Sequence, residues 1–168
     1  VLFVASARRI SCKRWLMCYW KCCSRMQVFI VGSPLETARA MAGDTLRYNK
    51  QIIEVGQILD ALNGAKAWSN HPCVLQYRGH EMWLGFYKYC LEYYANGWLR
   101  DAKIENDYAE SCKPPFHTEE YFNQMKSRLY TKNKEFYKHF AEYGESDTNW
   151  YWSQTENKFI KYINGKRV

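Results

Sequence analysis

Residues 47–59 read RYNKQIIEVGQIL, and this stretch predicts the element around which the rest of the chain packs. At 3.6 residues per turn, one stripe of its side chains can enter a core: Tyr48, Ile52, Val55, Leu59 and, one turn on, Leu62. Polar side chains collect on the other side: Arg47, Lys50, Gln51, Glu54 and Gln57. We therefore predict a long amphipathic helix. Its polar side is either an outer face on which Lys50 pairs with Glu54, or a functional surface.

Local signals set the bounds of this helix and of its neighbours. Asp44 or Thr45 caps its start, and Asn63-Gly64 ends it after Leu62. Ser33-Pro34-Leu35-Glu36 is a capping box that opens a short helix ending near Gly43. Further helices are predicted over 71–78, 80–96 (closed by Asn96-Gly97), 118–130 and 133–143, with a surface loop over 97–117. Extended segments are predicted at 27–31 and, as a hairpin, between 150–152 and 159–162.

The length of the chain fits one domain. Its 168 residues and 20.1 kDa are enough to bury a core without disulfides. We predict a mainly α fold, a compact single-domain helical bundle over residues 26–168, with short extended segments near residue 28 and at the C-terminus.

Residues 1–25 differ in composition from the rest. They hold six basic residues and no acid, which leaves 18 basic against 17 acidic residues in 26–168, although the whole chain has a net charge of +7. This leader lacks the apolar run of a signal peptide or a membrane span. We expect it to be a disordered basic arm, or upstream sequence outside a native protein that starts at Met26. Overall basicity is therefore weak support for a nucleic-acid partner, which would need charge gathered on one face.

The cysteine and histidine patterns favour neither a metal site nor a redox motif. Four of the seven cysteines lie in the leader, and Cys73, Cys90 and Cys112 are widely spaced, with no CxxC pair. The histidines show no HxxxH spacing. We predict no metal and no cofactor, with free thiols in a reducing cytoplasm.

Several motifs, in order along 26–152, resemble the pyrimidine-dimer DNA glycosylases of the phage endonuclease V type, in particular their bacterial and phage relatives. They are Arg47-x-x-Lys50-Gln51-x-x-Glu54-x-x-Gln57-Ile58-Leu59, Trp68-x-x-His71-Pro72, Tyr77-x-Gly79, Asn96-Gly97, Arg128-Leu129, Phe136-Tyr137 and Trp150-Tyr151-Trp152. The resemblance lies in the order and spacing of these motifs, since none is specific alone.

The resemblance implies an enzyme that removes a damaged base and then cuts the strand. In such enzymes a primary amine attacks C1′ of the damaged nucleotide, forms a Schiff base and leads to β-elimination, assisted by a glutamate to which Glu54 corresponds. A carboxylate can stabilise a cationic sugar and shuttle protons in such steps.

The amine is where this sequence departs from the family pattern. The phage enzyme uses the α-amine exposed when its initiator Met is removed before a small residue, whereas Gln27 is too large for the usual removal of Met26. An α-amine has a pKa of about 7.7–8.0, against about 10.4 for lysine, which favours the free amine of Met26 if residues 1–25 are absent. Lys50 is the alternative, although the neighbouring carboxylate would hold it protonated.

Eight residues are candidates for DNA contacts: Arg47, Gln51, Gln57, His71, Arg78, Lys88, Trp150 and Trp152. For the first three, surface hydrogen bonding is an equal alternative. For His71 the alternative is a helix cap, and for the two tryptophans a packed tail. The expected partner is double-stranded DNA with damaged bases, bound by a monomer away from membranes, in the cytoplasm of a bacterial or phage-infected cell. A non-catalytic nucleic-acid-binding protein on the same scaffold, or a structural protein, remains open.

Overall fold

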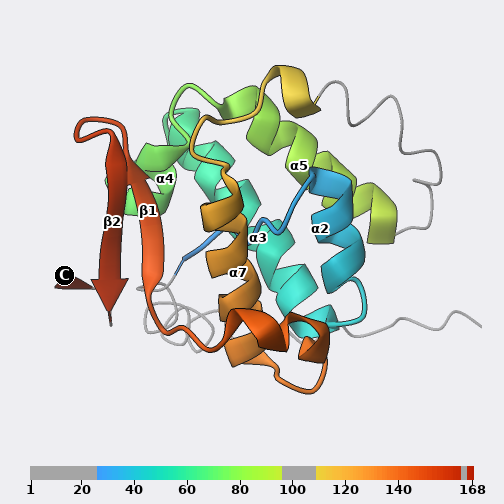
Figure 1. Cartoon of the computed structure of the whole chain (residues 1–168). Helices are drawn as coiled ribbons and strands as arrows, with labels where there is room; N and C mark the ends of the chain where they lie inside the picture. Colours follow the sequence, from blue (N-terminus) through green and yellow to red (C-terminus); the bar gives the residue numbers. More distant parts are fainter. Residues whose placement is uncertain (1–25, 96–108, 164–165) are drawn as a thin grey trace, which may run out of the picture.

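The computed structural model describes residues 26–95, 109–163 and 166–168 (Figure 1). The interpretation of residues 1–25 as a leader, the helix end at Asn96-Gly97 and most of the predicted 97–117 loop lie outside the described residues. Within them, the mainly α class is confirmed. The helices are α2 (Pro34–Met41), α3 (Thr45–Leu62), α4 (Pro72–Gln76), α5 (Glu81–Ala95), α7 (Glu119–Lys132) and the 3-10 helix η2 (Lys138–Tyr143).

One small antiparallel sheet lies beside the helices. It consists of β1 (Asn149–Ser153), β2 (Lys158–Ile163) and β3 (Lys166–Arg167), in that order. Asn149 pairs with Tyr162 and Ser153 with Lys158, so β1 and β2 form the predicted hairpin. Because β1 packs against α4, the sheet covers one end of the helical layer (Figure 1).

The predicted caps set the helix starts. Ser33 and Glu36 form both hydrogen bonds of the capping box at α2. The Asp44 side chain accepts from the backbone N–H of Arg47 at the start of α3. Gly64, with φ of 103°, follows the end of α3, in a backbone conformation that glycine adopts without strain. Short-range signals were therefore sufficient to bound the central helix.

The α-helix predicted over 133–143 is wrong in type. The side chain of Asn133 accepts from the backbone N–H of Phe136, as a cap would, but turns follow, and only Lys138–Tyr143 is helical, as a 3-10 helix. Aromatic residues recur at every third position here: Tyr137 directly before the 3-10 helix, and Phe140 and Tyr143 within it. A 3-10 helix has three residues per turn and aligns residues at i and i+3, so this spacing suits it better than an α-helix.

Residues 26–30 form the centre of the core and not a strand. They have no helical or sheet pairing, and they run between the helices on their way to α2 (Figure 1). The side chains of Met26, Val28 and Ile30 are fully buried. An unpaired backbone in such a place must find side-chain hydrogen-bond partners, and this requirement shapes the face that α3 presents.

The two-face division predicted for α3 is correct for Tyr48 and Val55 and wrong for Gln51 and Glu54. Gln51 is 1% exposed and Glu54 is 6% exposed, so both point into the protein. Ile53, which follows the apolar Ile52, is 48% exposed. The buried side of α3 therefore carries polar groups at its centre, because it faces the unpaired backbone of residues 26–30.

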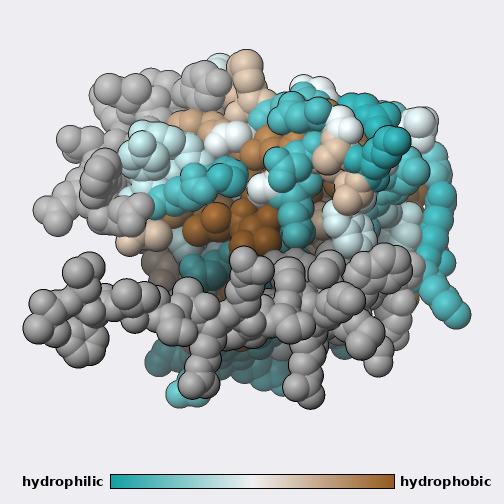
Figure 2. Space-filling view, turned by 180° about the vertical axis from the view of Figure 1, so that it is seen from behind, coloured by the Kyte–Doolittle hydropathy of each residue, from teal (hydrophilic) through white to brown (hydrophobic). Residues whose placement is uncertain are grey.

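No helix among the described residues has the length and hydropathy of a membrane span. Seen from behind, hydrophilic side chains surround a smaller apolar area (Figure 2). Large apolar residues with exposed surface include Leu46 on α3 and Met82 on α5.

Candidate active site

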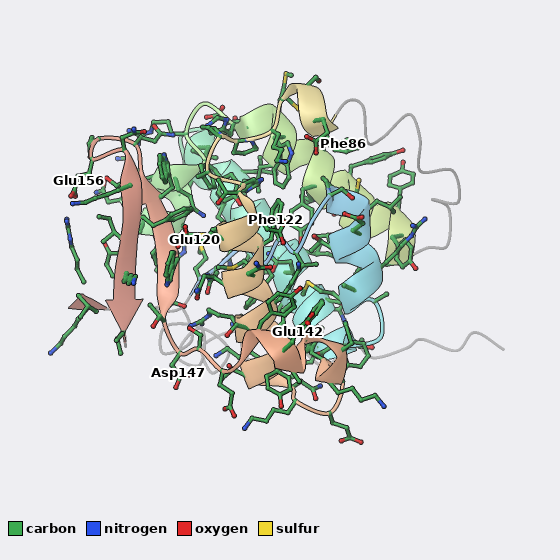
Figure 3. All side chains as sticks on the ribbon, in the orientation of Figure 1. Phe86, Glu120, Phe122, Glu142, Asp147 and Glu156 are labelled. Atoms are coloured by element: carbon green, nitrogen blue, oxygen red, sulfur yellow. The ribbon has the colours of Figure 1, made fainter. Side chains whose placement is uncertain are left out.

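Glu54 and Asp44 are the two buried carboxylates among the described residues. Carboxylates such as Glu120, Glu142, Asp147 and Glu156 are exposed (Figure 3). Asp44 is also buried, but it caps α3 and forms an ion pair of 3.0 Å with Arg47. Glu54 is buried with a much weaker partner. Its Oε1 lies 3.4 Å from Nζ of Lys50, whose side chain is 48% exposed.

Burial controls the acidity of Glu54. Loss of hydration raises the pKa of its carboxyl group from 4.5 to about 7, and the nearby Lys50 opposes this rise. A hydrogen bond from the backbone N–H of Gln27 and the charge of Lys132 also favour the carboxylate, but more weakly. At neutral pH both forms of Glu54 are therefore populated, which is the condition for an efficient general acid and base.

The nitrogen of Met26 lies next to this carboxylate through the covalent chain. The backbone nitrogens of adjacent residues are within about 3.7 Å of each other, by standard bond lengths. Since the N–H of Gln27 lies close enough to Glu54 to lower the pKa of its carboxyl group, the nitrogen of residue 26 is one residue away from this contact. The structure thus places Glu54 beside Lys50 and beside the residue that follows Met26.

Side chains from four elements hold the backbone of residues 26–29 in this place. Gln51 Oε1 accepts from the N–H of Phe29 at 3.0 Å. Three tyrosine hydroxyls donate to carbonyls: Tyr151 of β1 to Met26 at 2.7 Å, Tyr121 of α7 to Val28 at 3.3 Å, and Tyr87 of α5 to Phe29 at 2.8 Å. The position of the segment is therefore fixed by hydrogen bonds as well as by packing.

Sequence reasoning missed these three tyrosines. For Tyr151 a signal existed, because successive side chains of a strand point to opposite faces. In the motif Trp150-Tyr151-Trp152, the tyrosine must therefore face away from both tryptophans. For Tyr87 and Tyr121 the contacts span 58 and 93 residues, and no local pattern marks them.

The three α3 residues predicted to contact DNA have different environments. Gln51 is buried and bonded to Phe29, so a surface contact with DNA is wrong for this residue. The guanidinium group of Arg47 contacts Asp44 and donates to the carbonyl oxygen of Lys132 at 2.6 Å, which ties the start of α3 to the end of α7. Gln57 is half-buried, one turn after Glu54.

The capping interpretation is confirmed for His71. Its Nδ1 accepts from the backbone N–H of Cys73 at 3.1 Å, at the start of α4. Burial lowers the pKa of His71, which keeps the ring neutral and able to accept. Lys88 of α5 forms an ion pair with Glu92, one turn further along the same helix. Both His71 and Lys88 therefore have partners within the protein.

The two tryptophans of β1 contribute to packing. Trp150 is 8% exposed, with Nζ of Lys161 at 4.7 Å from the ring centre. Trp152 packs against Phe116 and Phe159, with ring centres 6.2 and 5.1 Å away. Both fit the packed-tail alternative, and Trp150 offers little ring surface for stacking on a base.

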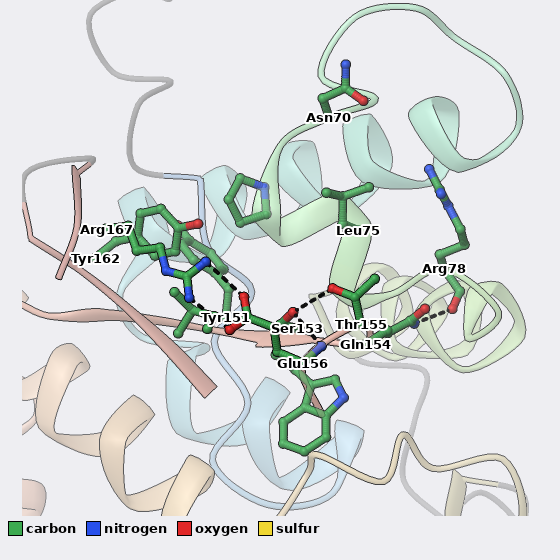
Figure 4. A pocket seen from close by; sticks show the side chains of 13 residues that line it. Asn70, Leu75, Arg78, Tyr151, Ser153, Gln154, Thr155, Glu156, Tyr162 and Arg167 are labelled. Carbon is green, nitrogen blue, oxygen red and sulfur yellow. Dashed lines mark hydrogen bonds and ion pairs between the residues drawn. The ribbon is translucent and has the colours of Figure 1, made fainter. Parts of the chain in front are cut away.

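A groove of about 270 Å³ lies between α4 and the β1–β2 hairpin (Figure 4). Arg78 and Asn70 stand on its α4 side, and Gln154 bridges the two walls by donating to the carbonyl of Arg78 at 2.6 Å. On the hairpin side Arg167 pairs with Glu156 at 2.8 Å. Tyr151 also lines the groove, so one side chain separates the groove from the peptide group of Met26.

No family of proteins, no curated protein and no solved structure matches this chain. Among the described residues, no group of three or more His, Cys, Asp or Glu side chains could hold a metal ion. The chemistry open to the site is proton transfer by Glu54, next to a backbone nitrogen at residue 26 and an amine at Lys50.

Proposed function

We propose that this protein is a DNA glycosylase with associated AP-lyase activity, acting on pyrimidine dimers in double-stranded DNA. The observation that carries the proposal is the buried carboxyl group of Glu54, with a pKa of about 7 and with Nζ of Lys50 at 3.4 Å. Imine formation on a sugar needs proton transfer beside an amine, and a carboxyl group with a pKa near neutral pH can provide it.

In the first step the neutral amine forms a bond to C1′ as the glycosidic C1′–N bond breaks. The electron pair of that bond leaves with the base, and the amine gives up a proton. Opening of the sugar ring then moves the C1′–O4′ electron pair to O4′, which takes a proton, and a protonated imine remains. Glu54 in its acid form can supply that proton, and its carboxylate can stabilise the cationic carbon.

In the second step a base removes a proton from C2′. The electrons form a C2′–C3′ double bond and expel the 3′ phosphate, which cuts the strand. Water then hydrolyses the imine and releases the amine. Glu54 would be positioned to pass the protons of the imine between these steps.

The proposed nucleophile is the α-amine of Met26 in a chain that starts at this residue. In a chain that retains residues 1–25, the same nitrogen belongs to a peptide bond and cannot react in this way. Lys50 is then the available amine, 3.4 Å from Glu54. A non-catalytic DNA-binding protein is the second candidate, favoured by the ion pair that Lys50 forms with Glu54.

Borohydride trapping separates these possibilities. The chain from Val1 and the chain from Met26 would each be mixed with duplex DNA that carries a cyclobutane thymine dimer or an abasic site, and then reduced. A covalent protein–DNA product that forms with the chain from Met26 and is lost in Glu54→Gln supports the proposal. DNA binding without a covalent product in either chain supports the non-catalytic alternative, and neither binding nor trapping rejects both.

A further inference from the structure

Two peptide groups of the buried segment each have a tyrosine at one edge and a side chain of α3 at the other. In a trans peptide the C=O and the N–H lie in one rigid plane and point in opposite directions. The carbonyl of Met26 and the N–H of Gln27 belong to the same plane. Tyr151 donates to that carbonyl at 2.7 Å, and that N–H lies close enough to Glu54 to lower the pKa of its carboxyl group.

The same arrangement recurs two residues later. The carbonyl of Val28 accepts from Tyr121 at 3.3 Å, and the N–H of Phe29 donates to Gln51 at 3.0 Å. Tyrosine hydroxyls thus bond one edge of each peptide plane, and an α3 side chain lies at the other edge, with a hydrogen bond from Phe29 to Gln51 in the second plane. Gln51 and Glu54 lie three residues apart on α3, so they project from the same side of that helix.

Only the first of these two planes adjoins the nitrogen of Met26. With that plane fixed, one backbone torsion, ψ of residue 26, places its nitrogen relative to the plane. Without the hydrogen bond from Tyr151, the peptide plane can turn about its remaining contact at the N–H edge. This rotation moves the nitrogen of Met26 relative to the carboxyl group of Glu54. The second plane is separated from this nitrogen by two further residues.

We propose that Tyr151 is a positioning residue, which holds the Met26–Gln27 peptide group so that the nitrogen of Met26 and the carboxyl group of Glu54 reach C1′ of the damaged nucleotide together. This inference rests on the proposed function with Met26 as the nucleophile. In this role Tyr151 needs no contact of its own with the reacting atoms. It acts through the carbonyl of Met26, and its ring packs at 5.8 Å from His71 and 5.3 Å from Tyr162.

Tyr151→Phe tests the inference, and Tyr121→Phe is the matched control. Both substitutions keep a buried ring and remove one hydroxyl that donates to a backbone carbonyl of the same segment. Both should lower the urea midpoint to a similar extent. Tyr87→Phe, which removes the bond to Phe29, is a second control.

The readout is the single-turnover rate of strand cleavage at an abasic site by the chain from Met26, with DNA affinity measured separately. We expect Tyr151→Phe to slow cleavage by about tenfold or more at unchanged affinity, since small misplacements of reacting groups cost orders of magnitude in rate. Both controls should stay within about twofold of the unchanged protein, by the same reasoning.

Equal rates for Tyr151→Phe and Tyr121→Phe would overturn the inference, and so would a loss confined to DNA affinity. If the unchanged chain from Met26 traps DNA through Met26 while the tyrosine variants do not differ, only this inference fails. If the unchanged chain gives neither cleavage nor trapping, the proposed function fails and this inference fails with it.

Discussion

Replacing Glu54 with glutamine should stabilise the protein in a manner that depends on pH. The pKa of Glu54 is raised from 4.5 to about 7 by burial. Because one pKa unit corresponds to 1.36 kcal/mol, the charged carboxylate costs the folded state about 3 kcal/mol above pH 7. Between pH 4.5 and 7, the folded protein keeps a proton that the unfolded chain has lost, so this group makes stability fall as pH rises.

Glu54→Gln removes the charge and keeps an oxygen that can accept from the N–H of Gln27. At pH 8 we expect the variant to unfold with a free energy up to about 3 kcal/mol higher than that of the unchanged protein. At pH 4 the carboxyl group is neutral in both states, and the two proteins should differ little. Urea unfolding followed by tryptophan fluorescence at pH 4, 6 and 8 measures the difference.

Glu120→Gln is the matched control, because it removes an exposed carboxylate from α7. It should change stability by no more than about 0.5 kcal/mol at each pH. A Glu54→Gln variant that is no more stable than the unchanged protein at pH 8 would contradict the reasoning. A gain that is the same at pH 4 and pH 8 would contradict it as well, because it would not come from the buried charge.

Three further substitutions test separate parts of the structure. Lys50→Met should raise the pKa of Glu54 further, because Lys50 favours the carboxylate, and a carbon-13 NMR titration of the Glu54 carboxyl group would detect the shift; an unchanged or lower pKa would show that this contact does not act on Glu54. His71→Ala should lower the free energy of unfolding at pH 7.5 by about 1 kcal/mol through loss of the α4 cap, and His71→Asn should restore most of it. Because the pKa of His71 is lowered in the fold, the contribution of His71 should fade below about pH 6.5, and a cost independent of pH would argue against a neutral capping ring. Ser33→Ala should also cost about 1 kcal/mol in urea unfolding through loss of the capping box, with Ser33→Asp close to the unchanged protein, and an equal cost in both would exclude the capping role.

The element bounds that the sequence predicted correctly depend on neighbouring residues. Asp44 begins α3 and Asn63-Gly64 ends it, because a side-chain cap and a glycine with positive φ act within one turn of the helix. The capping box at Ser33 was predicted correctly for the same reason. These signals require no knowledge of the rest of the fold.

The direction of Gln51 and Glu54 was not predictable from the pattern of α3 alone. The hydrophobic period assigned both to the polar side, since it counts only apolar residues as candidates for burial. Their burial follows from residues 26–30, which bring unpaired N–H groups into the core from a distance of more than 20 positions. Only the tertiary structure shows that the N–H groups of residues 26–30 need hydrogen-bond acceptors from side chains.

The candidate site, too, was predictable from the sequence only in part. Glu54 and Lys50 were predicted from the motif on α3 and Met26 from the change in composition after residue 25, and in the structure Glu54 lies next to Lys50 and to the N–H of Gln27. The hydrogen bonds that position Met26 come from Tyr151, at a sequence separation of 125, and its alternation with two tryptophans was the one local clue. Arg47 and Lys88 were expected to contact phosphates, but each forms an ion pair within the protein. The composition of the chain does not predict such pairs.

The central claim is that a nitrogen at residue 26 forms the imine beside Glu54, and the mass of the trapped peptide tests it most directly. The chain from Met26 would be trapped on abasic DNA with borohydride, digested with nuclease and protease, and its modified peptide sequenced by mass spectrometry. We predict that the added sugar fragment lies on the α-amine of Met26, and that it remains there in Lys50→Met. A fragment on Lys50, or no modified peptide at all, would contradict the account.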